Sequence, residues 1–211
     1  MLTQPLGWFR KEIRTTEDFE GVRYRTSDLA IELFKALGAA VTMLPGGAIV
    51  PAMERGVLDA ADSKNPSSDL QLGLPEVSKF YMTGGHHRQA EAFEVFFNKA
   101  RFDALPAELK AVLRQAAFSA SSDQLWHAYG RYAKDFEEIK KRGVSVAGTP
   151  SSVLQDQLKA WDKVIAEQSK EAFFAKVIVS QKAWVKRAGA FLAANNLDSG
   201  ELSAACRHFF G

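Results

Sequence analysis

Residues 22–44, VRYRTSDLAIELFKALGAAVTML, contain two short apolar runs on either side of a helical pattern. Val22 to Thr26 has the β-branched and aromatic residues that favour a strand, and Ala40 to Leu44 predicts a second one. Between them, apolar residues recur at helical spacing and Gly38 marks the end of the helix. The members of this stripe are Leu29, Ala30, Leu33, Phe34 and Leu37. A strand, a helix and a strand in this order indicate an α/β fold.

The same alternation of short strands and helices continues along the first half of the chain. Gly46-Gly47 predicts a turn, and Ile49 to Arg55 predicts a second helix. Further strands are predicted near Leu58 to Ala61, at Lys79 to Thr83 and at Glu91 to Asn98. We therefore expect residues 1–101 to form an α/β lobe.

The second half of the chain has helical patterns throughout. One helix is predicted to begin at Pro106, where a proline fits the first turn, and its apolar stripe continues to Gly143. Another begins at Pro150, and a last one spans Phe173 to Leu192. We expect residues 102–211 to be a helical region that packs on the lobe, and a homodimer through these helices is an open alternative.

The composition excludes several classes of protein. Among 211 residues, 27 basic and 25 acidic side chains are interleaved and leave a formal net charge of +2, so no nucleic-acid partner is expected. A single cysteine, Cys206, rules out an internal disulfide. The sequence has no run of 18 apolar residues that would predict a membrane span, and residues 1–20 lack the apolar stretch of a signal peptide.

Six blocks of this sequence, taken in order, carry a resemblance to a known family. The blocks are GWFRKEI (7–13), DFEGVRYR (18–25), ELFKALGA (32–39), PGGAIVPAMERGVLDAAD (45–62), FFNK (96–99) and LPAELKAVLRQAA (105–117). Together they closely resemble the extracytoplasmic solute-binding subunit of tripartite ATP-independent periplasmic (TRAP) transporters. The resemblance is to the branch, called DctP-like, that binds 2-oxo acids and related carboxylates.

The resemblance implies a fold and a function. The fold would be the C-terminal lobe of a type II periplasmic-binding-protein-like fold, followed by long C-terminal helices. The protein would be periplasmic, would bind a small organic acid without chemical conversion, and would deliver it to the membrane subunits of the transporter. Neither enzymatic activity nor a cofactor is implied. In the family a signal peptide and most of a first lobe precede the GWFRKEI block, so this chain resembles an N-terminally truncated member.

The resemblance also assigns candidate ligand-binding residues. Arg25 falls on the arginine that grips the ligand carboxylate, and a guanidinium suits this task because its two parallel N–H donors match two carboxylate oxygens. The alternative is an arginine in a surface ion pair. Gln4 falls on a glutamine that helps to ligate a bridging metal ion, although a frayed N-terminus is an equal alternative. Trp8 and Phe9 are expected in the core rather than at the ligand.

Other positions depart from the pattern of the metal-binding branch. Asp62 keeps a carboxylate where that branch has a glutamate, and Ser63 replaces a tryptophan. His86 and His87 replace aromatic residues, and Arg88 replaces a second metal-ligating glutamate. We therefore expect a metal-free site lined by Gln4, Arg25, Asp62, Ser63, His86 and Arg88. Arg88 would pair with Asp62 or with the ligand; the alternative is that its side chain turns to solvent.

Two further hypotheses come from different classes of protein. The chain could be a fragment without binding activity that acts as a helical dimerisation module. It could also be a metal hydrolase that uses the adjacent His86 and His87, but neighbouring residues point in different directions and no metal-binding spacing surrounds them. Cys206 and His208 lie near the C-terminus and do not indicate a catalytic pair. We rank an enzyme last.

Overall fold

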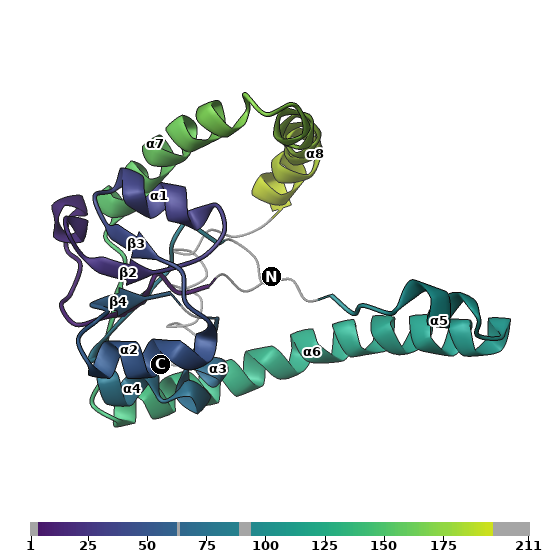
Figure 1. The fold of residues 1–211 in the computed structure, drawn as a ribbon, viewed down its shortest axis with the longest axis horizontal. Coiled ribbons are helices and arrows are strands. Elements are labelled where there is room, and N and C mark those ends of the chain that lie inside the picture. The colour runs from purple at the N-terminus through teal and green to yellow at the C-terminus, as the bar shows by residue number, and fades with distance from the viewer. Residues whose placement is uncertain (1–3, 63, 89–93, 196–211) are drawn as a thin grey trace. The chain divides into compact units, whose positions relative to one another are not determined.

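A six-stranded mixed sheet lies at the centre of the first of two units of this chain, in a computed structural model that describes residues 4–62, 64–88 and 94–195 (Figure 1). The first unit is Met1–Trp161 and the second is Asp162–Gly211. Within the described residues, no helix has both the length and the apolar character needed to cross a membrane.

The strand order of the sheet is β3-β2-β4-β1-β5-β6. The strands are β1 (Gly7–Phe9), β2 (Arg23–Arg25), β3 (Ala40–Thr42), β4 (Ala60–Ala61), β5 (Phe80–Thr83) and β6 (Ser145–Gly148). β2 pairs in parallel with β3 and β4, and β5 pairs in parallel with β6. β1 runs antiparallel to both of its neighbours, β4 and β5. The residues before β1 therefore lie at the edge where the parallel strands end.

Helices cover both faces of this sheet. The helices and 3-10 turns are η1 (Thr16–Phe19), α1 (Ala30–Ala36), η2 (Gly46–Ala48), α2 (Ile49–Glu54), α3 (Pro66–Leu72), α4 (Leu74–Val77), α5 (Lys99–Asp103), α6 (Ala107–Lys141), α7 (Ser151–Gln168) and α8 (Ala172–Asn195). α1 and the first part of α7 pack on one face. α2, α4 and the C-terminal end of α6 pack on the other (Figure 1).

Consecutive strand residues supply the two cores because successive side chains point to opposite faces of a sheet. In β1, Phe9 joins the core under α1, whereas Trp8 joins the core over α2. In β4, Ala60 and Ala61 divide in the same way. Trp8 and Phe9 are 0% and 1% exposed, which confirms that both belong to the core.

The structure confirms the α/β fold class and most of the predicted elements. The predicted strands at 22–26, 40–44, 58–61 and 79–83 are β2, β3, β4 and β5, and the helix between the first two is α1. The predicted helices at Ile49, Pro106, Pro150 and Phe173 are α2, α6, α7 and α8.

One predicted strand is wrong in the part that can be compared, and other elements were missed. The expected strand at 91–98 is described only for 94–98, which is not a strand. Aromatic residues favour a strand when they can pack against a neighbouring strand and a core. Phe96 has no such packing, since it is 84% exposed. The short elements β1, β6, α3, α4 and α5 had no predicted counterpart.

The division of the chain also differs from the expected boundary between 101 and 102. Ile139 and Val144 are buried in one core of the sheet, and Val153 and Ala160 in the other. β6 extends the sheet beside β5. These segments complete an α/β unit that extends to Trp161 and includes α6, a helix that the sequence analysis assigned to the helical region packing on the lobe.

Candidate functional site

The candidate site lies at the edge of the sheet where β2 and β4 end. Arg25 is the last residue of β2, and Asp62 directly follows β4. These two strands are parallel neighbours with Arg25 opposite Ala61, so both side chains leave the sheet at the same edge. The backbone N–H of Asp62 donates to the carbonyl of Arg25 at 2.9 Å, which fixes the start of the following loop.

The Arg25 guanidinium is held from two directions. Its Nη1 lies 3.0 Å from Oδ1 of Asp62, and its Nε donates to the carbonyl of Leu44 at 2.9 Å. The side chain is only 16% exposed. Within the described residues Nη2 has no hydrogen-bond partner, so the planar fork keeps a donor for a ligand.

Asp62 is a buried carboxylate that is surrounded by donors. Its side chain is 2% exposed, and besides Arg25 it accepts from the Thr26 hydroxyl at 2.7 Å. Nε of Arg88 lies 3.5 Å from its Oδ2. Burial raises the pKa of Asp62, while the Thr26 hydroxyl and the two guanidiniums act in the opposite direction and offset part of the rise.

Arg88 turns toward this carboxylate and not to solvent. Its Nη2 lies 2.9 Å from Oδ2 of Asp28 and donates to the carbonyl and the hydroxyl of Ser27 at 3.0 Å and 2.5 Å. The hydrogen bond from Arg88 lowers the pKa of Asp28. Asp28 adopts a left-handed backbone conformation with φ of 58°, which is uncommon for a residue with a side chain. Arg88 thus links the turn before α1 to Asp62.

Gln4 is ordered beside Arg88. It is 9% exposed, and its backbone N–H donates to the carbonyl of Arg88 at 3.2 Å. The antiparallel direction of β1 explains this place, because the segment leading into β1 runs along the edge where β2 and β4 end. This structure therefore places Gln4 at the edge of the candidate site.

An open cavity of about 610 Å³ brings four of the six predicted residues together. Gln4, Arg25, Asp62 and Arg88 line it. The sequence prediction missed its remaining lining residues, which are Ser27, Gly46, Gly47, Ile49, Lys64, Ser68, Gln71 and Leu72. Among them, Gly46-Gly47 lies in a predicted turn and Ile49 begins a predicted helix, but neither pattern indicates a binding role. Ser63 lies outside the described residues, and His86 is not among the lining residues of this cavity.

Lys64 reaches the cavity from a loop that is fixed by its neighbours. Its backbone N–H donates to Oδ1 of Asp69 at 3.2 Å, and Asp69 also accepts from the indole of Trp8 at 2.8 Å. Asn65 caps α3 by accepting from the backbone of Ser68 at 2.9 Å. The cavity therefore has a third cationic side chain besides Arg25 and Arg88.

The two adjacent histidines differ in burial, His86 being half-buried and His87 buried. The backbone of His86 accepts from the indole of Trp161 at 2.8 Å and donates to the Gln157 side chain at 2.7 Å. His87 is buried with its ring edge-on to Phe34 at 5.5 Å, and its ring nitrogens have no hydrogen-bond partner among the described residues. Burial lowers the pKa of His87 to about 3, and the charge of Arg88 contributes to the shift.

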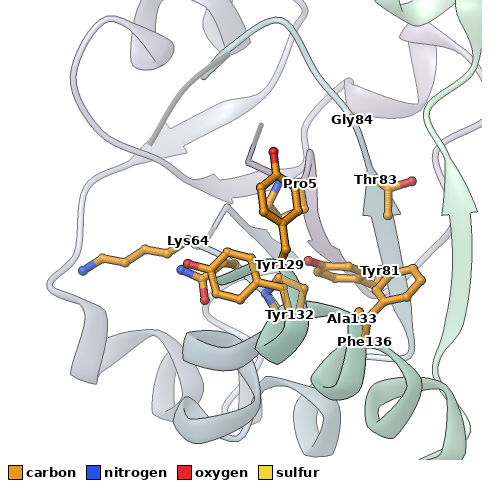
Figure 2. A pocket seen from close by; sticks show the side chains of 11 residues that line it. Pro5, Lys64, Tyr81, Thr83, Gly84, Tyr129, Tyr132, Ala133 and Phe136 are labelled. Atoms are coloured by element: carbon orange, nitrogen blue, oxygen red, sulfur yellow. The ribbon is translucent and has the colours of Figure 1, made fainter. Parts of the chain in front are cut away.

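A second cavity of about 330 Å³ has four aromatic side chains among its lining residues. Figure 2 shows Tyr129, Tyr132 and Phe136 of α6 close to Tyr81 of β5. It lacks Arg25, Asp62 and Arg88, and shares only Lys64 with the first cavity. The cationic groups that suit an anion therefore gather in the first cavity.

Comparisons with known proteins identify the family. Residues 4–176 match the family described as bacterial extracellular solute-binding protein, family 7, or DctP. A monocarboxylate 2-oxoacid-binding periplasmic protein of Nostoc sp. is 29% identical over 192 residues, which are 90% of this chain and 53% of that protein. An ectoine/5-hydroxyectoine-binding periplasmic protein of Ruegeria pomeroyi is 28% identical over 86% of this chain and 52% of its own length.

Solved structures agree with these sequence matches. A TRAP periplasmic solute-binding protein of Colwellia psychrerythraea with bound calcium and pyruvate superposes with a TM-score of 0.80 at 27% identity, covering 92% of this chain and 60% of that one. One from Pseudoalteromonas atlantica with bound sodium and pyruvate gives 0.78 at 30% identity, covering 99% and 62%. The relatives are solute-binding proteins and not enzymes, as the sequence led us to expect.

The chain spans about half the length of the curated relatives it matches. The family match nevertheless covers most of this chain and includes the sheet, the cavity at the ends of β2 and β4, and α6. The chain therefore belongs to the bacterial extracellular solute-binding proteins of family 7, the DctP family that includes the solute-binding proteins of TRAP transporters.

Proposed function

We propose that this chain contains the ligand-binding arginine of an extracytoplasmic solute-binding component of a TRAP-type transporter. It captures a small organic acid, a 2-oxo acid or a related carboxylate, through Arg25 and does not convert it. The observation that carries this proposal is the Arg25 guanidinium, which is fixed by Asp62 and Leu44 and keeps a donor at a cavity of about 610 Å³.

The relatives support this ligand class and its setting. One curated relative binds monocarboxylate 2-oxo acids, and two structural relatives hold pyruvate. The curated relatives named above are periplasmic proteins, so the proposed location is the periplasm and the proposed protein partners are the membrane subunits of a TRAP transporter. Gln4, Asp62 and Arg88 are proposed to shape the same site. Ser63 and His86 remain sequence-based candidates.

Replacing Arg25 by lysine is expected to weaken pyruvate binding about 10- to 100-fold, because an ammonium keeps the charge but not the planar pair of donors. Several rim residues of the cavity are exposed, so we expect the starting dissociation constant to be roughly 1 mM or weaker. Saturation-transfer NMR titration of pyruvate suits this range.

The matched control is Arg23→Lys, on the same strand. Arg23 pairs with Asp59 at 2.5 Å and does not line the cavity. Its replacement should leave the pyruvate titration unchanged. If Arg25→Lys and Arg23→Lys both bind pyruvate as the unmodified chain does, Arg25 is a structural residue and the proposed function loses its anchor.

The second candidate function is self-association through α8, with or without ligand binding. Large apolar side chains of α8 are exposed, among them Phe173 at 72% and Trp184 at 58%. Exposed apolar surface of this kind marks interaction sites in many proteins. The observation favours a partner for α8, and a second copy of the chain is the proposed partner.

Changing both Phe173 and Trp184 to serine is expected to weaken self-association about thirtyfold or more, since buried aromatic residues dominate most interfaces. Sedimentation velocity over a range of concentrations measures this effect. The control is the same pair of changes at Phe118 and Trp126 of α6, which are 70% and 75% exposed. A monomeric unmodified chain, or equal losses in both double variants, would argue against α8 as the interface.

A further inference from the structure

The metal ions found in two structural relatives do not fit the residues of this chain. Those relatives hold calcium or sodium together with pyruvate. We propose that in this chain the guanidinium of Arg88 supplies the positive charge beside Asp62, so that carboxylate binding at Arg25 requires no metal ion. The choice of a carboxylate ligand rests on the proposed function. The role of Arg88 rests on the contacts that Asp62 makes.

The first step is that each oxygen atom of Asp62 already has a donor beside it. Oδ1 lies 3.0 Å from Nη1 of Arg25. Oδ2 accepts from the Thr26 hydroxyl at 2.7 Å and lies 3.5 Å from Nε of Arg88. A metal ion at this carboxylate would have to share it with these three donors, two of which carry a positive charge.

The second step concerns the other groups around Asp62. Calcium takes six to eight oxygen ligands, and carboxylates are the ones that balance its charge. The described residues contain no group of three or more His, Cys, Asp or Glu side chains that could hold a metal ion. Arg25, Lys64 and Arg88 line the cavity with Asp62, and these cationic groups have no lone pairs to offer and repel a metal ion.

The third step is that Arg88 is held in position. Nη2 of Arg88 is bound by Ser27 and Asp28. The backbone carbonyl of Arg88 accepts from the N–H of Gln4 at 3.2 Å. The guanidinium keeps Nη1 without a partner among the described residues. It therefore presents a fixed charge at the same cavity as Arg25 and, as far as the described residues show, a donor for a ligand carboxylate.

The first experiment measures pyruvate binding by the unmodified chain, using saturation-transfer NMR in buffer with EDTA, with calcium chloride or with sodium chloride at matched ionic strength. We expect the same affinity in all three. Arg88→Gln should weaken pyruvate binding about tenfold in EDTA, and Arg23→Gln should not change it. Loss of binding in EDTA with recovery in calcium or sodium would overturn the inference, as would unchanged binding by Arg88→Gln.

The second experiment separates this inference from the proposed function, because it needs no organic ligand. Thermal unfolding of the unmodified chain should be the same with calcium chloride and with EDTA, since an ion that binds the folded state raises the midpoint. In Arg88→Glu a carboxylate replaces the guanidinium that lies against both Asp62 and Asp28, and calcium should raise the unfolding midpoint of this variant. Arg23→Glu, beside the half-buried Asp59 and outside the cavity, should show no such rise.

A calcium-dependent rise in the unmodified chain overturns the inference even if pyruvate never binds. Absence of pyruvate binding together with absence of a calcium effect contradicts the proposed ligand but supports the metal-free site. If Arg88→Glu does not fold, Arg88→Gln and the unmodified chain still decide the question.

Discussion

Replacing Asp62 by alanine is expected to lower the free energy of unfolding by about 3–5 kcal/mol, the range observed when one partner of a buried ion pair is removed. The change leaves the Arg25 and Arg88 guanidiniums, whose side chains are 16% and 25% exposed, without their shared carboxylate. It also leaves the Thr26 hydroxyl, which is buried, without its acceptor. Urea denaturation at neutral pH measures the loss.

This cost does not mean that the ion pair adds much net stability. Burial raises the pKa of Asp62 despite two neighbouring arginines, so the ionised carboxylate is held in unfavourable surroundings. The loss in the variant comes from the charges that remain. Asp59→Ala is the matched control, because Asp59 pairs with Arg23 in a more exposed place and should cost only about 1 kcal/mol. Equal losses at the two positions would contradict a special role for Asp62.

Lowering the pH is expected to destabilise the chain through His87. Its pKa is about 3 in the folded chain against an ordinary value of 6.5, so between these values the unfolded chain binds a proton that the folded chain does not. The stabilising contribution is complete above about pH 6.5 and falls by roughly 1.4 kcal/mol per pH unit below it. At pH 3 the loss amounts to about 5 kcal/mol.

The measurement is urea denaturation of the unmodified chain and of His87→Leu between pH 7 and pH 4. The unfolding free energy of the unmodified chain should fall steadily relative to that of His87→Leu as the pH falls, because leucine does not titrate. Comparing the two proteins removes the effect of Asp62 and of every other titrating group they share. His127→Leu, an exposed site on α6, controls for the loss of a histidine. Parallel pH profiles for the unmodified chain and His87→Leu would contradict this assignment.

The part of the fold that was predicted from sequence is the part with strong local patterns. The strand ending at Arg25, the helix α1 and the strand β3 follow one another within 23 residues, and each has its own periodicity. The helical pattern of long amphipathic segments such as α7 was equally easy to predict from the sequence. Arg25, Asp62, Gln4 and Arg88 were named through the resemblance to a family, and their meeting at one cavity follows from strand pairing that no local pattern contains.

The parts that could not be predicted depend on contacts between distant residues. β6 is only SVAG, and its pairing with β5 joins residues 65 positions apart. β1 has three residues, all buried, so it shows no alternation. Lys64 and Ser27 reach the cavity from turns whose shape is set by Asp69 and Arg88. No periodicity in the sequence reports such positions.

The tight packing around His87 limits which side chains residues 85 and 87 can have at the same time. A methyl group added at Gly85 would come within 2.7 Å of Nδ1 of His87, nearer than side-chain carbons tolerate. Side-chain volume at one position is thus limited by volume at the other, and a larger residue at 85 demands a smaller one at 87. In related chains, we expect residues 85 and 87 to change in size together, a larger residue at 85 accompanying a smaller one at 87.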